Sequence, residues 1–523
     1  MITRRTLGLA FAVLLVLYAI PGWADTCPSD IANFLAGKAV GVVCTASTDL
    51  TTNNLATTPA NNTTVTTFAD GSPLPGLDNG FGAFTPTTDR SVISNGPAPI
   101  TGPVPGLQVE GWFADDPLGE ARFLLRFPNN WNGRLVVAGA SGTRSEFNGD
   151  YAWSDYVLQK GYAYASQNKG IYNLYLPTNG SQDPLACRLN PSSTTFVHFF
   201  DNDAGKPFTQ WTDYMLEAAK LAQGAAKANY HHPVRYTYAV GTSNGGYQVR
   251  RAIEQAPDLF DGGVDWEGTF IDPDGPNILI SLPPAIANFL AYAGDFGPAS
   301  FDPTSQAAQN ILNAGYPPDI VLRDGSGNVT GSLWLNYWTA FWEVTACQWQ
   351  KRFDPTYQTY VAGLGNYDYF YRAENVPGVY SSVKAVETTG KIKKPLITVA
   401  GTMDALLPIQ NQARAYEALV KAWRKGNDDK RKEQYRLYEV QNGNHIEAYQ
   451  IAGIDSPLLP PGQLSGPFPE LELIQPYAQN AFDLLVDHVE NGAPLPKSQC
   501  IPKGGSIEDH PSQPGHCSQL FVP

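Results

Sequence analysis

The chain has 523 residues, of which 43% are hydrophobic and 16% are charged, and its formal net charge is −14. A chain of this length and composition can bury a large core and should contain more than one structural unit, which excludes a small binding module. The acidic balance argues against nucleic acid as a partner.

Residues 1–24 have the pattern of a signal peptide. Arg4 and Arg5 precede an apolar stretch from Leu7 to Ile20, and small residues follow it. The paired arginines also suggest the twin-arginine export route. A membrane anchor is the alternative, but the stretch is shorter than the ~20 residues that span a bilayer, so we expect no stable anchor. Without this segment the formal charge is −16. The sequence predicts an exported protein, periplasmic or extracellular.

The next segment, 25–105, is rich in Thr, Asn, Pro and Gly over most of its length. We expect it to be extended or β-structured and to lie over the core, with strand-like residues at 64–68. A catalytic core is predicted to begin near residue 106. Within it, the apolar run Leu135–Ala138 predicts a buried strand that ends in a turn of small residues at 139–142.

The stretch Tyr236–Gly246 places Ser243 between two glycines directly after a β-branched and aromatic run. This G-x-S-x-G pattern is typical of a nucleophile elbow, a sharp turn from strand to helix that lifts the serine hydroxyl above the sheet. Gly241 and Gly245 fit that turn, because a Cβ there would collide with a neighbouring strand or helix. The pattern also occurs by chance, so its surroundings matter.

The residues that follow Ser243 supply those surroundings. Val249, Ile253 and Ala256 fall on one face of a helix that stops at Pro257, and an apolar strand follows. The order of strand, turn, serine, helix and strand is the setting in which the elbow works. The sequence therefore predicts an α/β-hydrolase fold, a mostly parallel central sheet flanked by helices.

Between this region and the next apolar strand, Pro395–Ala400, the chain is longer than two strands and their helices need. Residues 268–390 are therefore predicted to form a large lid insertion. The segment is dense in aromatic residues, which at helical spacing more often form a core. The alternative is an aromatic-lined pocket for the acyl or alcohol group. The candidate substrate-binding residues are Trp266, Glu267, Trp338 and Trp342.

A serine hydroxyl needs a base to take its proton and an acid to orient that base. Asp404 follows the strand Pro395–Ala400, and His445 follows a later apolar run in a loop of Gly and Asn. The order Ser243, Asp404, His445 is the triad order of α/β-hydrolases. Asp404 could instead cap a helix, and Asp265 or Glu267 is a rival acid.

Backbone amides usually stabilise the oxyanion of the transition state. One predicted donor is the amide of Asn244, the residue after the nucleophile. We assign the second to the 139–142 turn, to Ala140 or Ser141, although that turn could be a simple strand exit.

All six cysteines lie after the predicted signal peptide, and an even number in an exported protein predicts disulfides. Sequence does not fix their connectivity, but loop closure favours the shorter loops. The favoured pairs are Cys27 with Cys44, Cys500 with Cys517 and, by remainder, Cys187 with Cys347. No C-x-x-C pattern or histidine cluster indicates zinc, so we expect no metal and no organic cofactor.

Three segments, FPNNWNGRLVVAGASG, GYAYASQNKG and YAVGTSNGGYQVRRAIEQAPDLFDG, carry a resemblance to a known family. The chain resembles secreted tannases and feruloyl esterases of the α/β-hydrolase class over about 105–270 and 390–450. Carried over residue by residue, the resemblance implies Ser243 as nucleophile, Asp404 as acid and His445 as base.

That family usually has cysteines directly before the serine and after the histidine, bridged beneath the triad. This chain has Thr242 and Ile446 there, so the bridge cannot form. Secreted depolymerases and oligomer hydrolases of hydroxyalkanoate polyesters have similar elbows without it.

Together these features predict a secreted serine carboxylic-ester hydrolase acting on esters of aromatic or hydroxy acids. The predicted organisation is an N-terminal extension (25–105), a catalytic core (106–267 and 391–497), the lid insertion (268–390) and a C-terminal tail (498–523). The alternatives are a hydrolase of polyester or hydroxyalkanoate oligomers, a serine peptidase, and a non-catalytic binding protein on the same scaffold. The expected partner is a small-molecule or oligomeric ester; the sequence does not predict an oligomeric state.

Overall fold

The structure is a computed structural model that describes residues 27–54, 56–58, 100–117, 119–142, 145–171, 177, 180–198, 208–426 and 434–523. The predicted signal peptide lies outside the described residues, as do most of the N-terminal segment and its strand-like residues at 64–68.

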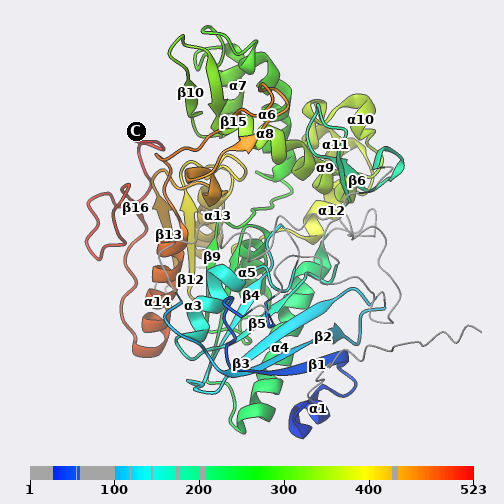
Figure 1. The fold of residues 1–523 in the computed structure, drawn as a ribbon, viewed down its shortest axis with the longest axis vertical. Helices are drawn as coiled ribbons and strands as arrows, with labels where there is room; N and C mark the ends of the chain where they lie inside the picture. The colour runs from blue at the N-terminus through cyan, green and yellow to red at the C-terminus, as the bar shows by residue number, and fades with distance from the viewer. Residues whose placement is uncertain are drawn as a thin grey trace, which may run out of the picture.

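A ten-stranded sheet runs through the lower part of the molecule (Figure 1). The pairings β1–β2, β2–β3 and β3–β5 are antiparallel, and every pairing from β5 to β16 is parallel. This is the mostly parallel sheet of an α/β-hydrolase, as predicted. In spatial order the strands are β1 (Ala39–Ser47), β2 (Gly106–Phe113), β3 (Arg122–Pro128), β5 (Ala163–Gln167), β4 (Arg134–Gly139), β8 (Tyr236–Thr242), β9 (Gly262–Trp266), β12 (Leu396–Gly401), β13 (Tyr435–Val440) and β16 (Gln499–Ile501).

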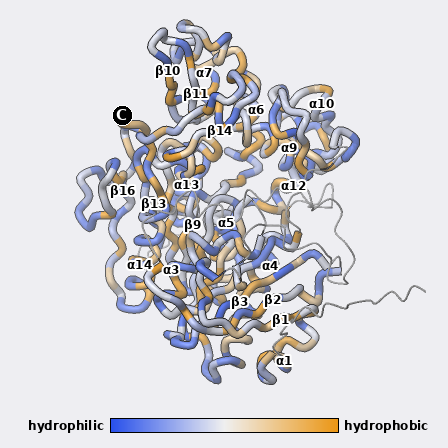
Figure 2. Tube along the Cα trace, viewed as in Figure 1, coloured by the Kyte–Doolittle hydropathy of each residue, from blue (hydrophilic) through white to orange (hydrophobic). Residues whose placement is uncertain are grey.

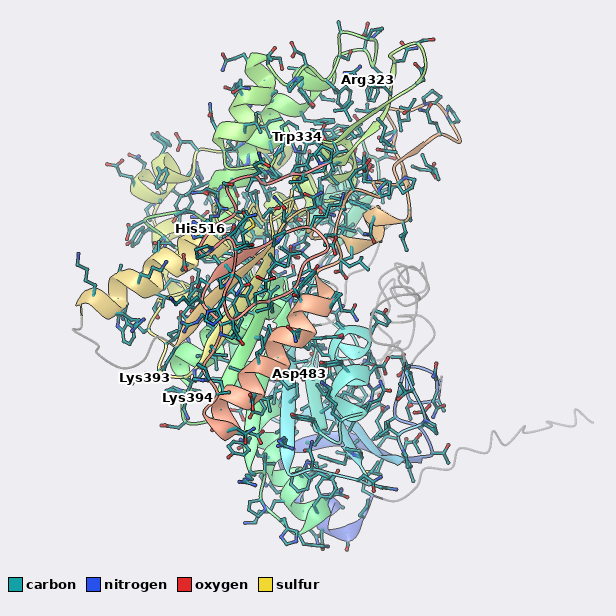
Figure 3. The ribbon with its side chains drawn as sticks, turned by 90° about the vertical axis from the view of Figure 1, so that its left-hand side faces the viewer. Arg323, Trp334, Lys393, Lys394, Asp483 and His516 are labelled. Carbon is teal, nitrogen blue, oxygen red and sulfur yellow. A yellow bond between two sulfur atoms is a disulfide. The ribbon has the colours of Figure 1, made fainter. Side chains whose placement is uncertain are left out.

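The central strands are buried along their whole length because helices cover both faces of the sheet. On one face the core contains side chains of α1 (Ser29–Leu35), α4 (Thr209–Tyr230), α5 (Asn244–Gln255) and α13 (Ala413–Gly426). On the other face lie the π-helical turn η4 (Asp150–Ser154), α3 (Asp155–Leu158) and α14 (Gln475–Asn491). Figure 3 shows α14, which carries Asp483, lying along the sheet.

Residues 268–390 contribute no strand to the large sheet and instead form a helical layer at the top of Figure 1. Its elements are α6 (Ile278–Ala293), α7 (Gln306–Asn313), β10 (Val321–Arg323), β11 (Val329–Ser332), α8 (Leu333–Ala340), α9 (Trp342–Phe353), α10 (Thr359–Ala362), η6 (Leu364–Asn366), α11 (Tyr369–Asn375) and α12 (Val379–Ala385). Trp334 lies among these helices (Figure 3). The buried aromatic side chains of this layer share one core with residues 403–407 of the sheet domain, so the layer is packed onto the sheet rather than hinged from it.

Short elements from elsewhere in the chain complete this layer. They are η5 (Gly180–Gln182), the hairpin β6 (Ala186–Arg188) and β7 (Phe196–His198), the turn η7 (Glu447–Gln450), and the hairpin β14 (Ile454–Asp455) and β15 (Leu464–Ser465). The disulfide Cys187–Cys347 joins β6 to α9. It fastens a segment that precedes the elbow to the insertion that follows it.

The other two disulfides, Cys27–Cys44 and Cys500–Cys517, stabilise the two edges of the sheet, so the structure contains the three favoured pairs. The sequence prediction ended the catalytic core at residue 497, but β16 extends the sheet beyond that point. A three-residue strand is too short to produce a periodic pattern, so the sequence did not reveal it.

Hydrophobic and hydrophilic residues alternate along the chain in both layers (Figure 2). Among the helices of the described residues, none combines the length and the apolar character that crossing a bilayer requires.

Candidate active site

The elbow lies between β8 and α5, where the sequence predicted it. Ser243 has φ 58° and ψ −123°, a left-handed conformation that is strained for a residue with a Cβ. Its amide donates to the carbonyl oxygen of Trp266 at 2.9 Å, and its carbonyl accepts from Tyr247 at 3.1 Å, so both sides of the turn are fixed. A Cβ on Gly245 would lie 2.5 Å from the carbonyl oxygen of Gly139, which explains why glycine is needed there.

The structure brings the three predicted triad residues together. His445, in the loop after β13, has its Nε2 3.0 Å from Ser243 Oγ and its Nδ1 2.8 Å from Asp404 Oδ2. Asp404 Oδ1 also accepts the amides of Leu406 and Leu407, at 2.8 and 2.7 Å. The alternative that Asp404 caps a helix is wrong, because Leu406 and Leu407 lie in a loop and the next helix, α13, begins only at Ala413.

The surroundings of His445 favour its protonated form. Burial by itself lowers the pKa of this imidazole, but the charge and hydrogen bond of Asp404, followed by Glu267 and Glu447, raise the pKa to about 9. The side chain is only 5% exposed, so water screens these interactions little. A base of this kind readily accepts the proton of a serine hydroxyl 3.0 Å away.

Of the two rival acids, Glu267 lies at the imidazole. Its Oε2 is 3.5 Å from Nδ1 of His445, and its Oε1 accepts the amide of Gly401 at 3.1 Å. Its side chain is 1% exposed, which corrects its prediction as a substrate-binding residue. Asp265 lies deeper, where it pairs with Arg250 and accepts the hydroxyl of Thr398 at 2.8 Å.

Glu267, Asp404 and His445 are also the only group of three metal-ligand residues within reach of one another that the described part of the chain contains. Their side chains are almost fully buried, and Asp404 already binds the imidazole and two amides. These contacts fit a hydrogen-bonded triad better than a metal site, because a cation would have to displace them.

The first predicted oxyanion donor is well placed. Asn244 is the first residue of α5, and the first amides of a helix have no acceptor within it. The side chain of Asn244 accepts the hydroxyl of Thr269 at 2.9 Å, which fixes the start of the helix directly beside Ser243.

The second predicted donor is corrected by the structure. The amide of Ala140 already donates to Gln248 Oε1 at 2.9 Å, and that of Ser141 to Asn148 Oδ1 at 2.6 Å. Both amides would have to exchange partners to bind an oxyanion. The sequence could not show this, because Gln248 and Asn148 approach the turn only in the folded chain.

Side chains of the insertion layer form hydrogen bonds with the loops that carry Asp404 and His445. The phenol of Tyr337 on α8 donates to Asn444 Oδ1 at 2.8 Å and accepts the amide of Ile446 at 3.2 Å, so it contacts both neighbours of the histidine. The indole of Trp342 donates to the carbonyl oxygen of Ala405, next to the acid, at 2.7 Å. Sequence reasoning missed this role of Tyr337, which only its place in a dense aromatic run marked out.

The aromatic residues predicted to line a pocket are part of the core. Trp338 and Trp342 are both 0% exposed, and Trp338 stacks on Phe289 with ring centroids 5.4 Å apart. Trp266 is 4% exposed and packs edge-on against Trp153 on the helix-covered side of the sheet. The predictions of Trp266, Trp338 and Trp342 as substrate-binding residues are therefore wrong, since a buried ring offers no surface to a ligand.

Two other histidines have structural partners. His488 Nδ1 lies 2.6 Å from the carbonyl oxygen of Ala493, and His516 pairs with Glu417 at 2.9 Å. These contacts agree with the prediction that His445 is the histidine suited to the base.

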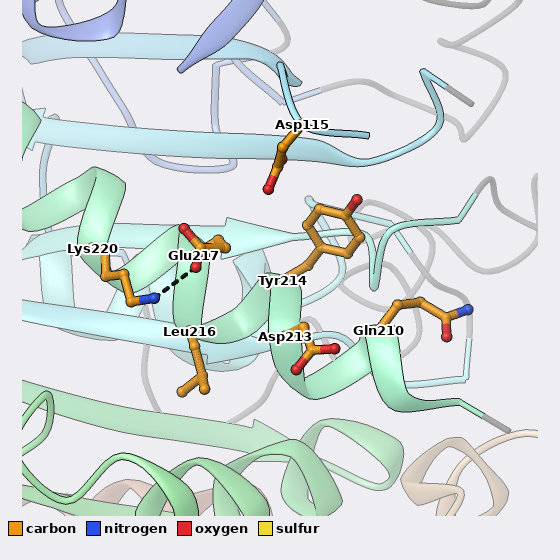
Figure 4. Close-up of a pocket in the computed structure, with 7 residues that line it drawn as sticks. All are labelled: Asp115, Gln210, Asp213, Tyr214, Leu216, Glu217 and Lys220. Carbon is orange, nitrogen blue, oxygen red and sulfur yellow. Dashed lines mark hydrogen bonds and ion pairs between the residues drawn. The ribbon is translucent and has the colours of Figure 1, made fainter. Parts of the chain in front are cut away.

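A cavity of about 360 Å³ lies beside α4 (Figure 4). None of the three triad residues lines it. Its only lysine, Lys220, pairs with Glu217, so the cavity is acidic and separate from the candidate site. The lining residues are Asp115, Gln210, Asp213, Tyr214, Leu216, Glu217 and Lys220.

Comparison with protein families adds an independent observation. Residues 359–514 match the family model described as 3HB-oligomer hydrolase (3HBOH). The matched range contains Asp404 and His445, but not Ser243.

Individual relatives agree with this match. The chain is 34% identical over 138 residues to a D-(-)-3-hydroxybutyrate oligomer hydrolase of Burkholderia pseudomallei, and 34% identical over 136 residues to one of Burkholderia thailandensis. Each match covers 25% of this chain and only 17% of the relative's length.

Solved structures with a similar course of the chain include feruloyl esterase B from Aspergillus oryzae, at 14% identity and a TM-score of 0.45, over 89% of this chain and 90% of that one. Tannin acyl hydrolase from Aspergillus niger is similar at 13% identity and a TM-score of 0.42, over 75% and 80%.

Proposed function

We propose that the protein is an exported serine carboxylic-ester hydrolase that cleaves oligomers of a hydroxyalkanoic acid such as 3-hydroxybutyrate. The observation that carries the proposal is the chain of contacts from Ser243 Oγ to His445 Nε2 at 3.0 Å and from His445 Nδ1 to Asp404 at 2.8 Å. These are hydrogen-bond distances, and they connect nucleophile, base and acid in the roles that acyl transfer requires.

The proposed reaction has two steps. Ser243 Oγ attacks the ester carbonyl while His445 takes its proton, and the amide of Asn244 donates to the oxyanion. The collapsing intermediate expels the alcohol end of the oligomer, which takes the proton from the imidazole. Water then attacks the acyl-enzyme in the same way and releases the acid. Asp404 holds the imidazole in position and stabilises its charged form throughout.

The substrate class rests on the matched stretch 359–514 and on the two Burkholderia relatives, whose printed names give oligomers of 3-hydroxybutyrate. Burial of Trp338 and Trp342 removes one reason for expecting a phenolic ester, the aromatic-lined pocket. Export is supported by three disulfides, which persist in oxidising compartments.

The test uses the purified protein and its Ser243→Ala variant. We expect a fluorophosphonate probe to label the wild type and not the variant. We also expect the wild type to release 3-hydroxybutyrate monomers from the dimer and trimer faster than it hydrolyses methyl ferulate, methyl gallate or a chromogenic dipeptide amide. Labelling without oligomer cleavage would reject the substrate class, faster amide cleavage would indicate a peptidase, and absence of labelling would reject the mechanism and favour a binding protein.

A further inference from the structure

Besides the three triad residues, a second buried carboxyl group lies at the imidazole. Glu267 directly follows β9, the strand next to β8, and its Oε2 lies 3.5 Å from the same nitrogen that Asp404 contacts at 2.8 Å. We infer that Glu267 is a second acid partner of His445, a positioning residue that shares the Nδ1 proton with Asp404 and can replace it. The inference rests on the proposed triad and adds a fourth member to it.

The backbone of Glu267 adopts a strained conformation that places its carboxyl group beside the imidazole. Its φ is +51°, a left-handed conformation that is rare for a residue with a Cβ. The amide of Glu267 donates to the carbonyl oxygen of Val399 at 2.9 Å, and Trp266 just before it accepts the amide of Ser243. The turn that carries the second carboxyl group is therefore tied directly to the nucleophile elbow. Strain of this kind persists where the surrounding structure requires a particular side-chain position.

The two carboxyl groups differ in the number of hydrogen bonds that they accept. Asp404 Oδ1 accepts two backbone amides, those of Leu406 and Leu407. Glu267 accepts one amide on Oε1, whereas its buried Oε2 has no hydrogen-bond partner among the described residues. Burial first, and then the negative charge of Asp404, raise the pKa of Glu267 well above its usual range. Asp404, which lies closer to Nδ1 and accepts more amides, is therefore the first partner of the imidazole, and Glu267 is the second.

The groups that face Glu267 come from three elements. Asp404 belongs to the loop after β12, His445 and Glu447 to the loop after β13, and Tyr337 to α8. Removing the Asp404 carboxylate removes the main charge that opposes ionisation of Glu267. Oε2 of Glu267, 3.5 Å from Nδ1, is then the remaining carboxylate oxygen that can accept the Nδ1 hydrogen bond of the imidazole. Burial makes this charged contact strong, because little water screens it.

The decisive experiment compares Asp404→Ala with Asp404→Ala/Glu267→Gln on a short p-nitrophenyl ester, which reads the chemistry independently of the natural oligomer. We expect the single variant to lose about 10²-fold in kcat, and the double variant to approach the roughly 10⁴-fold loss known for a triad without its acid. The control is Asp404→Ala/Glu447→Gln, because Glu447 is also acidic and near His445 but uses its Oε1 to accept the amides at the start of α14. We expect the control to equal the single variant.

A second measurement uses the single variant Glu267→Gln, in which Asp404 is retained. Glu267→Gln removes a group that can become negative 3.5 Å from Nδ1, so the acidic limb of kcat/KM should move to lower pH by about one unit. A purely structural role of Glu267 would lower activity without moving the limb.

The imidazole N–H proton supplies a readout that does not depend on turnover. We expect its downfield NMR resonance to persist in Asp404→Ala and to disappear in the double variant with Glu267→Gln. Equal kcat in the single and double variants, an unmoved acidic limb, or loss of the resonance in Asp404→Ala alone would overturn the inference. Failure of the proposed function is distinguishable, because it would appear in the wild type as absence of ester hydrolysis and of fluorophosphonate labelling.

Discussion

Tyr337→Phe tests whether the insertion positions the loop that carries His445. The phenol is fully buried and makes two hydrogen bonds, to Asn444 Oδ1 at 2.8 Å and from the amide of Ile446 at 3.2 Å. Phenylalanine keeps the ring and leaves both partners unsatisfied. An unsatisfied buried polar group costs about 1–3 kcal/mol, and Asn444 is fully buried whereas Ile446 is only partly so. We therefore expect a loss of about 2 kcal/mol in stability.

Activity should fall as well, because both partners are neighbours of His445 in the chain. If misplacement of the imidazole raises the activation free energy by about 1.4 kcal/mol, kcat falls roughly tenfold. The matched control is Tyr316→Phe, since the buried hydroxyl of Tyr316 has no hydrogen-bond partner among the described residues and its removal should cost nothing. The assays are kcat on a p-nitrophenyl ester and retention of activity in urea. If the Tyr337→Phe protein matches the Tyr316→Phe control in both assays, the two hydrogen bonds of Tyr337 do not position the loop that carries His445.

Three further predictions concern the elbow, the base and the covalent link. Gly245→Ala brings a Cβ within 2.5 Å of the Gly139 carbonyl oxygen, so we expect about 3 kcal/mol of destabilisation, whereas Gly325→Ala, which meets no atom within 4 Å, should melt like the wild type. Because the pKa of His445 is raised to about 9, kcat/KM should rise with pH from neutral to about 9. The stability contributed by the protonated imidazole should be full below about pH 6.5 and lost as pH rises through about 9; a profile that is flat from pH 6 to 9 would contradict this. Cys347→Ser opens the disulfide that joins β6 to α9 and should lower stability by about 2–5 kcal/mol; reductant should destabilise the wild type more than the variant, because the variant keeps only the other two disulfides.

The sequence by itself determined the sheet domain and the order of the triad. Ser243, Asp404 and His445 each follow an apolar run that became a central strand, and the ends of parallel strands meet at one edge of a sheet. Local rules were sufficient there, because strand, glycine turn and helix follow one another within a few residues. Sequence separation favoured the two short cysteine pairs found in the structure, since short loops close at the lowest entropic cost, although it did not fix the connectivity.

Only the tertiary structure decided which polar groups surround the triad. Glu267 reaches the imidazole because β9 and β12 are neighbours in the sheet, and Tyr337 reaches the base loop because the insertion packs onto it. The amide of Ala140 or Ser141 was predicted to be the second oxyanion donor, yet side chains from α5 and from residue 148 accept both amides. Contacts of this kind join residues far apart in the chain, and their geometry depends on how whole layers pack. Local sequence patterns carry no information about such distances, which is why the aromatic run of the insertion favoured a core but left a pocket open as the alternative.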